Sequence, residues 1–443
     1  MLSRVAAALP SSAPDLRLRL EPCKLEIAPG VVIETIAYNG QVPGPMLRLK
    51  QGRPVMIDVT NASPHHDIVH WHGLLTDSLN DGAVEEGSRM IVPSETLRYH
   101  LTPQPAGTRW YHTHAMAKDD LTRGAYSGQF GFLLVENGKE IAPYDREVNL
   151  AIRHWDPHFV PMVSMLRSQS QNVPQTAGSD VGYRYATINA HCLGAGEPIR
   201  VRHGERILFR FLNASATENV LLALPGHRFY VIAMDGNPVP TPKAVEVLAL
   251  AVGERVDAIV HMDSPGVWIL GSTLKESRDI GLGVVVEYAG IKGSPVWRDP
   301  PPVEWDYTQF AGGPSNREPD ETIPLTFRDA GALNGSMFDT WTINGDAYDD
   351  SKPILLTQGK RYRLLFRNAS GDQHPMHLHR HSFELVRIDD QVTSGLIKDV
   401  VNVMPLQTIA VDFTADNRGD TLFHCHQQLH MDYGFMRLFR YTS

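Results

Sequence analysis

Four short motifs each pair two histidines with one residue between them: His70/His72, His112/His114, His377/His379 and His424/His426. On a β-strand, residues i and i+2 point to the same face, so each motif delivers two imidazoles to one side. Eight neutral imidazoles are too many for one ion, but they suit a cluster of about three metal ions with positions left open for oxygen species. The motifs therefore predict a buried cluster of metal ions.

The fourth motif also contains a thiol. Cys425 stands between His424 and His426, and strand alternation turns its side chain to the opposite face. His374 and His430 are close to these motifs in the sequence, and two histidines with one cysteine and a weak or absent axial ligand form a blue-copper site. Because Cys425 is bonded through the backbone to both flanking histidines, an electron taken up here has a short covalent route to the cluster. This arrangement favours the four-electron reduction of O2 to water.

An internal repeat sets the positions of these motifs. Asn61, Asn213 and Asn368 each stand 9 positions after a glycine, Gly52, Gly204 and Gly359, and the three glycines are 152 and 155 residues apart. Histidine pairs stand at plus 9 and plus 11 from Asn61 and from Asn368, where the middle copy has Leu222 and Leu224. At the second pair the middle copy has Gly271 and Thr273. One fold is therefore expected three times, with no metal ligands in the middle copy.

The elements that must position these residues are strands. Short β-rich runs lie between each repeat glycine and its asparagine, and no long helical period is present. This pattern predicts an all-β protein of three Greek-key β-sandwich domains, with boundaries at 1–142, 143–292 and 293–443. Each repeat asparagine begins an Asn-Ala-Ser glycosylation pattern. Because that pattern recurs at the repeat position, we interpret the asparagine as closing a turn.

Composition excludes several classes of protein. The 443 residues include 20 His but only 3 Cys, which excludes a disulfide framework and an iron–sulfur protein. The net charge of −9 gives no basic footprint for nucleic acid. No apolar stretch is long enough to span a membrane. The small residues of Met1–Pro10 are similar to the tail of an export signal. We expect an exported monomer, periplasmic or extracellular.

Four sequences resemble the copper-binding motifs of the multicopper oxidases: His70-Trp-His-Gly, Trp110-Tyr-His-Thr-His114, His374-Pro-Met-His-Leu-His379 and His424-Cys-His-Gln-Gln-Leu-His430. The resemblance covers essentially the whole chain, including the middle copy without ligands. It implies three cupredoxin-like domains and four copper ions, one of type 1, one of type 2 and two of type 3.

Carried over by position, the resemblance also implies which residues bind each ion. The type 1 copper would take His374, Cys425 and His430, and the type 2 copper would take His70 and His377. One type 3 copper would take His72, His112 and His426, and the other would take His114, His379 and His424. Other histidines, such as His65 and His66, are expected to be surface or turn residues.

Four further roles follow from the resemblance. Phe435 would occupy the axial position of the type 1 copper without coordinating it, which raises the reduction potential, and Met436 would point elsewhere. Asp81 would be the acid that relays protons near the type 2 copper. A second acid that often stands beside the last ligand histidine is replaced by Met431. Cys23 and Cys192 would form a disulfide between the first two domains.

The family implies an oxidase that couples oxidation of a reducing substrate to reduction of O2. The leading hypothesis is a laccase-like oxidase of phenols or aromatic amines that receives electrons near His430. However, His227 stands where fungal laccases carry an acid that helps take the proton of the phenol. The alternative is an exported metallo-oxidase of Cu(I) or Fe(II), which would need an acidic or methionine pair beside the type 1 site. A non-enzymatic cupredoxin protein would have lost ligands, whereas all eleven are present.

Overall fold

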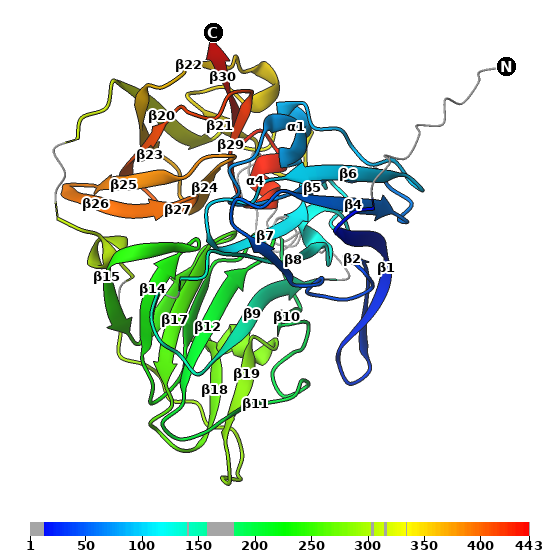
Figure 1. The fold of residues 1–443 in the computed structure, drawn as a ribbon, viewed down its shortest axis with the longest axis vertical. Helices are drawn as coiled ribbons and strands as arrows, with labels where there is room; N and C mark the ends of the chain where they lie inside the picture. Colours follow the sequence, from blue (N-terminus) through cyan, green and yellow to red (C-terminus); the bar gives the residue numbers. More distant parts are fainter. Residues whose placement is uncertain are drawn as a thin grey trace, which may run out of the picture.

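The computed structural model describes residues 13–139, 141–156, 181–302, 305–313, 317–333 and 335–442. Residues Met1–Pro10, on which the export expectation rests, lie outside this range. The described residues form six sheets, and these divide along the chain into three two-sheet sandwiches (Figure 1). The predicted all-β fold is confirmed. No helix in the described part of the chain is both long and apolar enough to cross a membrane.

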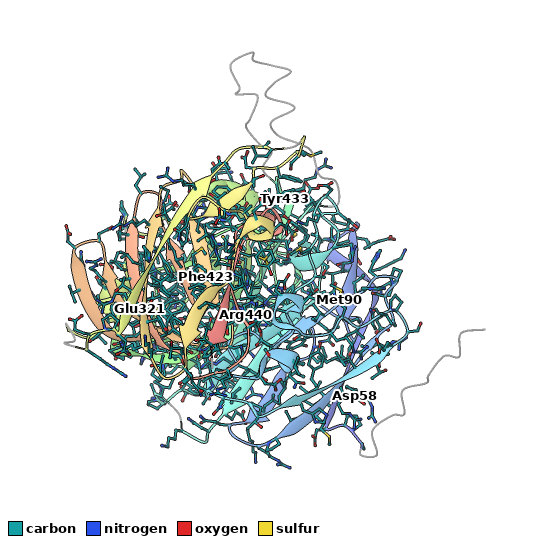
Figure 2. The ribbon with its side chains drawn as sticks, turned by 90° about the horizontal axis from the view of Figure 1, so that it is seen from above. Asp58, Met90, Glu321, Phe423, Tyr433 and Arg440 are labelled. Atoms are coloured by element: carbon teal, nitrogen blue, oxygen red, sulfur yellow. The ribbon has the colours of Figure 1, made fainter. Side chains whose placement is uncertain are left out.

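The first sandwich has sheets ordered β2-β1-β4-β6 and β3-β8-β7-β5. Its strands are β1 (Leu16–Ala28), β2 (Val31–Tyr38), β3 (Leu47–Lys50), β4 (Val55–Asn61), β5 (Val69–His70), β6 (Thr96–Leu101), β7 (Gly107–Thr113) and β8 (Phe130–Glu136). It is drawn in blue and cyan in Figure 1, and Figure 2 shows Asp58 and Met90 within it.

The second sandwich has sheets ordered β10-β9-β12-β17-β14-β15 and β11-β19-β18-β13-β16. Its strands are β9 (Arg146–Trp155), β10 (Tyr185–Ile188), β11 (Ile199–Val201), β12 (Arg206–Asn213), β13 (Val220–Ala223), β14 (Phe229–Met234), β15 (Asn237–Val245), β16 (Val247–Leu250), β17 (Arg255–His261), β18 (Val267–Ser272) and β19 (Gly283–Tyr288). It forms the green lower part of Figure 1.

The third sandwich has sheets ordered β21-β20-β23-β28-β25-β26 and β22-β30-β29-β24-β27. Its strands are β20 (Glu321–Asp329), β21 (Trp341–Ile343), β22 (Ile354–Thr357), β23 (Arg361–Asn368), β24 (His374–Leu378), β25 (Phe383–Ile388), β26 (Gln391–Lys398), β27 (Val400–Val403), β28 (Thr408–Thr414), β29 (Thr421–Cys425) and β30 (Met436–Thr442). Short helices complete the described residues: α1 (Ser78–Asp81), α3 (Lys275–Asp279), α4 (Gln428–Asp432), η1 (Val84–Glu86), η2 (Gly124–Tyr126), η3 (Tyr307–Phe310) and η4 (Tyr348–Asp350).

The sequence repeat corresponds to one structural element used three times. The repeat asparagines Asn61, Asn213 and Asn368 end strands β4, β12 and β23, and all three are buried. In each copy the side-chain amide donates to carbonyls of two separate segments of the chain, for example from Asn61 to His65 and Ile91. The repeat glycines adopt a positive φ, +72° at Gly52, which glycine tolerates without strain. Burial of the asparagines supports their role in closing a turn.

Apolar clusters join the three sandwiches. One contiguous cluster of buried residues runs through the second and third sandwiches. A smaller cluster ties the first sandwich to the second, with Ile27 and Trp110 on one side and Leu212 on the other. The protein interior is close-packed, so these clusters hold the first and third sandwiches at fixed positions relative to each other.

Candidate metal centre

The four histidine pairs come from four strands of two sandwiches. In each pair the first histidine lies within a strand, β5, β7, β24 or β29, and the second lies beyond its end. Strand register places the pairs side by side, since His70 is opposite His112 in the first sandwich and His377 is opposite His424 in the third. Both platforms face the junction between the sandwiches, and all eight imidazoles are at most 6 % exposed.

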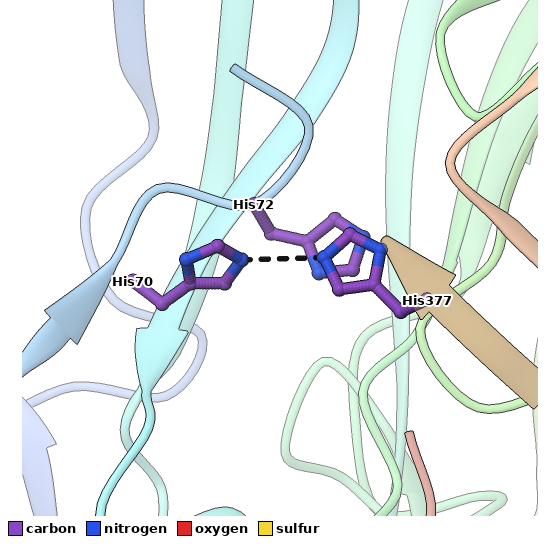
Figure 3. Close-up of side chains that lie close together, drawn as sticks. All are labelled: His70, His72 and His377. Carbon is purple, nitrogen blue, oxygen red and sulfur yellow. Dashed lines mark hydrogen bonds between the residues drawn. The ribbon is translucent and has the colours of Figure 1, made fainter. Parts of the chain in front are cut away.

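Ring nitrogens from opposite ends of the chain meet across this junction. The Nε2 atoms of His70 and His377 are 3.4 Å apart, as Figure 3 shows. Nδ1 of His72 lies 3.3 Å from Nε2 of His426. The Nε2 atom of His424 is 3.4 Å from that of His114 and 3.0 Å from that of His379. We call these eight residues the cluster histidines.

The cluster histidines fall into three groups whose ligand atoms lie within 4.8 Å of one another: His70/His72/His377, His72/His112/His426 and His114/His379/His424. A tetrahedral ion with metal–nitrogen bonds of about 2.0 Å would space its donors by about 3.3 Å. In addition, Nε2 of His112 is buried without a hydrogen-bond partner among the described residues. The donor set therefore fits a group of metal ions.

Burial keeps seven of the eight imidazoles neutral. Desolvation lowers the pKa of His424 to about 3. It also lowers the pKa of six others well below the usual range, with neighbouring imidazoles adding to the effect: His72, His112, His114, His377, His379 and His426. A neutral imidazole has a free lone pair for a metal ion.

Asp81 orients two cluster histidines from the end of α1. Its Oδ2 atom accepts from Nδ1 of His379 at 2.8 Å, and its carbonyl accepts from Nδ1 of His70 at 3.0 Å. Both rings therefore direct Nε2 toward the centre. Glu86, which we did not predict from the sequence, lies beside Asp81 with Oε1 3.4 Å from Nδ1 of His379. Burial and the neighbouring Asp81 charge raise the pKa of Glu86 well above its usual range.

A second carboxylate links the cluster to the middle sandwich. Nε2 of His72 donates to Oδ1 of Asp399 at 3.0 Å, while the Asp399 carbonyl accepts from Nδ1 of His377 at 2.7 Å. Arg255 of the middle sandwich holds the Asp399 carboxylate through two bonds of 2.6 Å. All four side chains are buried. The ligand-free sandwich therefore fixes the orientation of ligand histidines in the other two.

On the other face of β29, Cys425 meets His374 and His430. Its Sγ lies 3.4 Å from Nδ1 of His430 and 4.0 Å from Nδ1 of His374. The two Nδ1 atoms are 3.2 Å apart, and Nε2 of His374 is bonded to Ser370 at 2.7 Å. Desolvation lowers the pKa of both histidines, to about 3 for His374, and raises that of the thiol. A bound cation reverses the effect on the thiol, because a coordinating thiol is deprotonated.

Aromatic rings close this second site. The Phe435 ring lies 4.7 Å from that of His374, whereas Met436 packs in a separate cluster with Leu422 and Met431. Trp341, which we did not predict, covers His430 with ring centroids 4.1 Å apart. It lies between repeat motifs, so spacing carried no signal for it.

The expected Cys23–Cys192 disulfide is wrong for this structure, in which both thiols are free. Sγ of Cys23 donates to the Gly40 carbonyl at 3.2 Å. Both side chains pack into the cluster that joins the first two sandwiches. That junction is thus held by apolar contacts, and the thiols act as small hydrophobic groups there.

Comparisons with known proteins agree with this geometry. Three family models described as multicopper oxidase match residues 21–140, 108–283 and 318–443. Multicopper oxidase MmcO of Mycobacterium tuberculosis is 28% identical, and the match covers 93% of this chain and 83% of that protein. Laccase-15 of Oryza sativa is 32% identical, over 51% of this chain and 38% of that protein. The crystal structure of Fet3p, described as a multicopper oxidase that functions in iron import, has a TM-score of 0.82 at 18% identity, covering 96% of this chain and 90% of that one.

Proposed function

Because the chain belongs to the multicopper oxidase family and is a copper-dependent oxidoreductase that uses O2, we propose that it oxidises phenols or aromatic amines one electron at a time. The observation that carries this proposal is the position of Cys425. Its side chain faces His374 and His430, while the two residues bonded to it, His424 and His426, face the cluster. One strand end therefore joins a site for single electrons to a site that can collect four.

We assign four copper ions to these residues. The type 1 ion would be held by His374, Cys425 and His430, the type 2 ion by His70 and His377, and the type 3 pair by the other six cluster histidines. When bound, copper supplies one-electron transfer at the first site and reduction of O2 at the others. Phe435 offers no ligand atom, and its buried ring against His374 favours the reduced ion and a high potential.

The chain's own groups orient the ligands and deliver protons. Asp81 holds the rings of His70 and His379 through their Nδ1 atoms. Its other oxygen, Oδ1, is buried without a hydrogen-bond partner among the described residues, so it is available to carry a proton toward the cluster. Glu86 is close enough to pass one on.

The surroundings of His430 favour an aromatic donor. Leu429 and Phe338 belong to one apolar cluster, and the half-buried Tyr433 ring lies 5.1 Å from that of Phe338. His227, at the position of the laccase acid, is buried in the second sandwich and bonded to Tyr288 at 2.6 Å, so no carboxylate stands there. Laccase-15 among the relatives also supports phenols as substrates.

Oxidation of Cu(I) or Fe(II) is the second candidate. The exposed Asp372 lies two residues before His374, and its charge contributes to the raised pKa of Cys425. Fet3p, with its described role in iron import, is a relative of the same fold. A single exposed acid falls short of the acidic or methionine pair that we expect beside the site of a metallo-oxidase, so phenols remain the first choice.

Oxygen uptake by the copper-loaded protein tests the proposal. We expect faster turnover with 2,6-dimethoxyphenol than with Cu(I) or Fe(II). Negligible phenol oxidation beside fast metal oxidation would overturn the substrate assignment and leave the family unaffected. The matched variant is Phe435→Met, which should lower the type 1 potential and slow phenol oxidation.

The proposal also covers the domain boundaries, the localisation and the oligomeric state. We propose domains at 1–142, 143–292 and 293–443, since β8 ends at Glu136, β9 begins at Arg146, β19 ends at Tyr288 and β20 begins at Glu321. We also propose an exported, periplasmic or extracellular protein, supported by the residues of Met1–Pro10. Finally, we propose a monomer, which sedimentation of the loaded protein tests.

A further inference from the structure

A hollow of about 520 Å³ in the first sandwich reaches one of the cluster histidines. Its lining residues are Pro64, His65, His66, Val84, Glu85, Met90, His114, Ala115, Met116 and Arg123. His66 is exposed and His114 is buried, so the hollow runs from the surface to the centre. Three other hollows, of about 120, 630 and 670 Å³, contain no cluster histidine. We call this one the His114 hollow.

Two of the donor side chains along the His114 hollow carry soft sulfur atoms. Met90 and Met116 contribute thioethers, and His65 and His66 contribute imidazoles in addition to that of His114. Both methionines are partly exposed, and Figure 2 shows Met90 on the first sandwich. Thioether ligands select Cu(I) over hard divalent ions, and imidazole also binds copper. A water-filled passage would need none of these sulfur atoms.

Charge in the His114 hollow neither attracts nor excludes a cation strongly. Arg123 is its only arginine or lysine, and Glu85 is its only carboxylate. Oε2 of Glu85 is buried and has no hydrogen-bond partner among the described residues. A monovalent cation passing close to Glu85 would give this buried oxygen an electrostatic partner. Selection must therefore come from the softness of the donors.

The donors along the hollow are spread out. None of the tight groups of three His, Cys, Asp or Glu ligands found in the described residues includes His65, His66 or Glu85. An ion would be held there by one or two donors at a time. Weak, successive contacts allow transfer, whereas the groups of cluster histidines bind with three donors each.

We propose that the His114 hollow is the route by which Cu(I) reaches the cluster histidines when the metal centre is filled. Met90 and Met116 bind the ion in transit, and His114 receives it. This inference rests on the proposed copper cluster, but it concerns how the cluster is filled rather than what the enzyme oxidises. No electron transfer is involved, because Cu(I) enters and is bound as Cu(I).

The test measures copper uptake by the full chain after removal of its metal with a chelator. Cu(I) is supplied under anaerobic conditions as its acetonitrile complex, and protein-bound copper is measured over time after desalting. We expect the double variant Met90→Leu/Met116→Leu to fill its cluster about tenfold more slowly, since leucine preserves volume but removes the sulfur donors. The matched control Met46→Leu/Met404→Leu removes two methionines outside the hollow and should fill at the wild-type rate.

Repeating the uptake with Cu(II) separates a soft-donor route from a mere opening. Slowing confined to Cu(I) supports the proposal. Equal slowing of both ions, or no slowing of Cu(I), overturns it. Thermal unfolding of the copper-free variants identifies any that fail to fold, and His65→Ala then provides the substitute. If the filled wild-type protein consumed no O2 with any donor, the proposed function would fail while the uptake comparison remained valid.

Discussion

The second sandwich and the third sandwich share a strand plan but treat the same position in opposite ways. Where the third places His377 and His379, the second has Leu222 and Leu224, both buried in its apolar core. Corresponding buried positions are therefore occupied by leucines in the second sandwich and by histidines in the third. Leucine at this position contributes to folding, whereas histidine contributes metal binding.

None of the ligand groups found in the described residues includes a residue of the second sandwich, yet this sandwich contacts the metal centre. Arg255 holds Asp399, which holds His72. A Cβ added at Gly253 would lie 2.7 Å from the ring of His426, so the backbone of the second sandwich packs directly against that ligand. The comparison teaches that a sandwich without ligands can position the ligands of its neighbours.

The largest effect should come from a cysteine of the third sandwich. Cys425→Ser removes the only sulfur ligand of its site, so we expect complete loss of the cysteine-to-copper absorption and oxidation of substrates at background rates. Copper at the cluster histidines should remain. Absorption spectra, copper content and oxygen uptake check this.

The matched control is Cys192→Ser. Cys192 is a buried cysteine of the second sandwich, and it belongs to none of the possible metal-binding groups found in the described residues. It should keep both the absorption band and turnover. A coloured Cys425→Ser protein would contradict the assignment of the thiol.

Arg255→Met tests the support given by the second sandwich. The substitution leaves the buried Asp399 carboxylate without its main partner, which should destabilise the protein by about 3–5 kcal/mol. Because His72 loses its orientation, copper affinity of the cluster should fall about 10–100-fold. Denaturant unfolding of the copper-free protein and copper titration measure the two effects.

Arg206→Met offers a control in the same sandwich, because Arg206 forms a surface pair with Asp145 at 3.1 Å. Its removal should cost no more than about 1 kcal/mol and leave copper binding unchanged. Unaltered copper affinity in Arg255→Met would show that the second sandwich acts on stability alone.

Leu222→Ala should affect folding without affecting the metal. Removing a fully buried leucine costs about 2–5 kcal/mol, yet the position contributes no ligand. Protein that remains folded at low temperature should bind its full complement of copper. Loss of copper in proportion to loss of stability would erase the distinction between the two sandwiches.

The smallest effect concerns pH. His154 of the second sandwich is buried beside Ser215, and desolvation lowers its pKa from 6.5 to about 3. The unfolded chain therefore binds a proton below about pH 6.5 that the folded chain refuses, so stability is lost as the pH falls from 6.5 toward 3. His154→Gln should reduce this slope by up to about 1.4 kcal/mol per pH unit.

Unfolding curves of the copper-free protein at several pH values measure this slope. Seven cluster histidines also have a lowered pKa and act with the same sign, so most of the acid sensitivity should remain in the variant. A wild-type slope abolished by His154→Gln would mean that the outer sandwiches contribute little.

The repeat made the cluster histidines predictable, because one spacing rule generated four pairs and strand periodicity put each pair on one face. The same rule predicted a middle copy without ligands, and the β-rich runs between the repeat glycines and asparagines predicted the all-β fold. The position of Cys425 could be predicted for the same reason, since alternation along β29 turns its side chain to the face opposite His424 and His426. Phe435 required the family resemblance to choose between it and Met436.

The supporting residues were not predictable in this way. Asp399 meets His72 across 327 positions of sequence, and Arg255 meets Asp399 across 144. Neither Asp399 nor Arg255 stands at a repeat position. Which buried charges meet is decided by how the sandwiches pack. Glu86 and Trp341 could not be predicted for the same reason. The disulfide failed because it rested on relatives, whereas here both thiols pack in an apolar junction.

The pairing of His72 with His426 has a consequence for biosynthesis. The two residues are 354 positions apart in the sequence, and each group of cluster histidines combines the first and third sandwiches, so no group can form before the third sandwich has been made. Until then the four histidines of the first sandwich lack their partners from the third sandwich. Filling of the metal centre therefore has to follow synthesis of the third sandwich and its packing against the first.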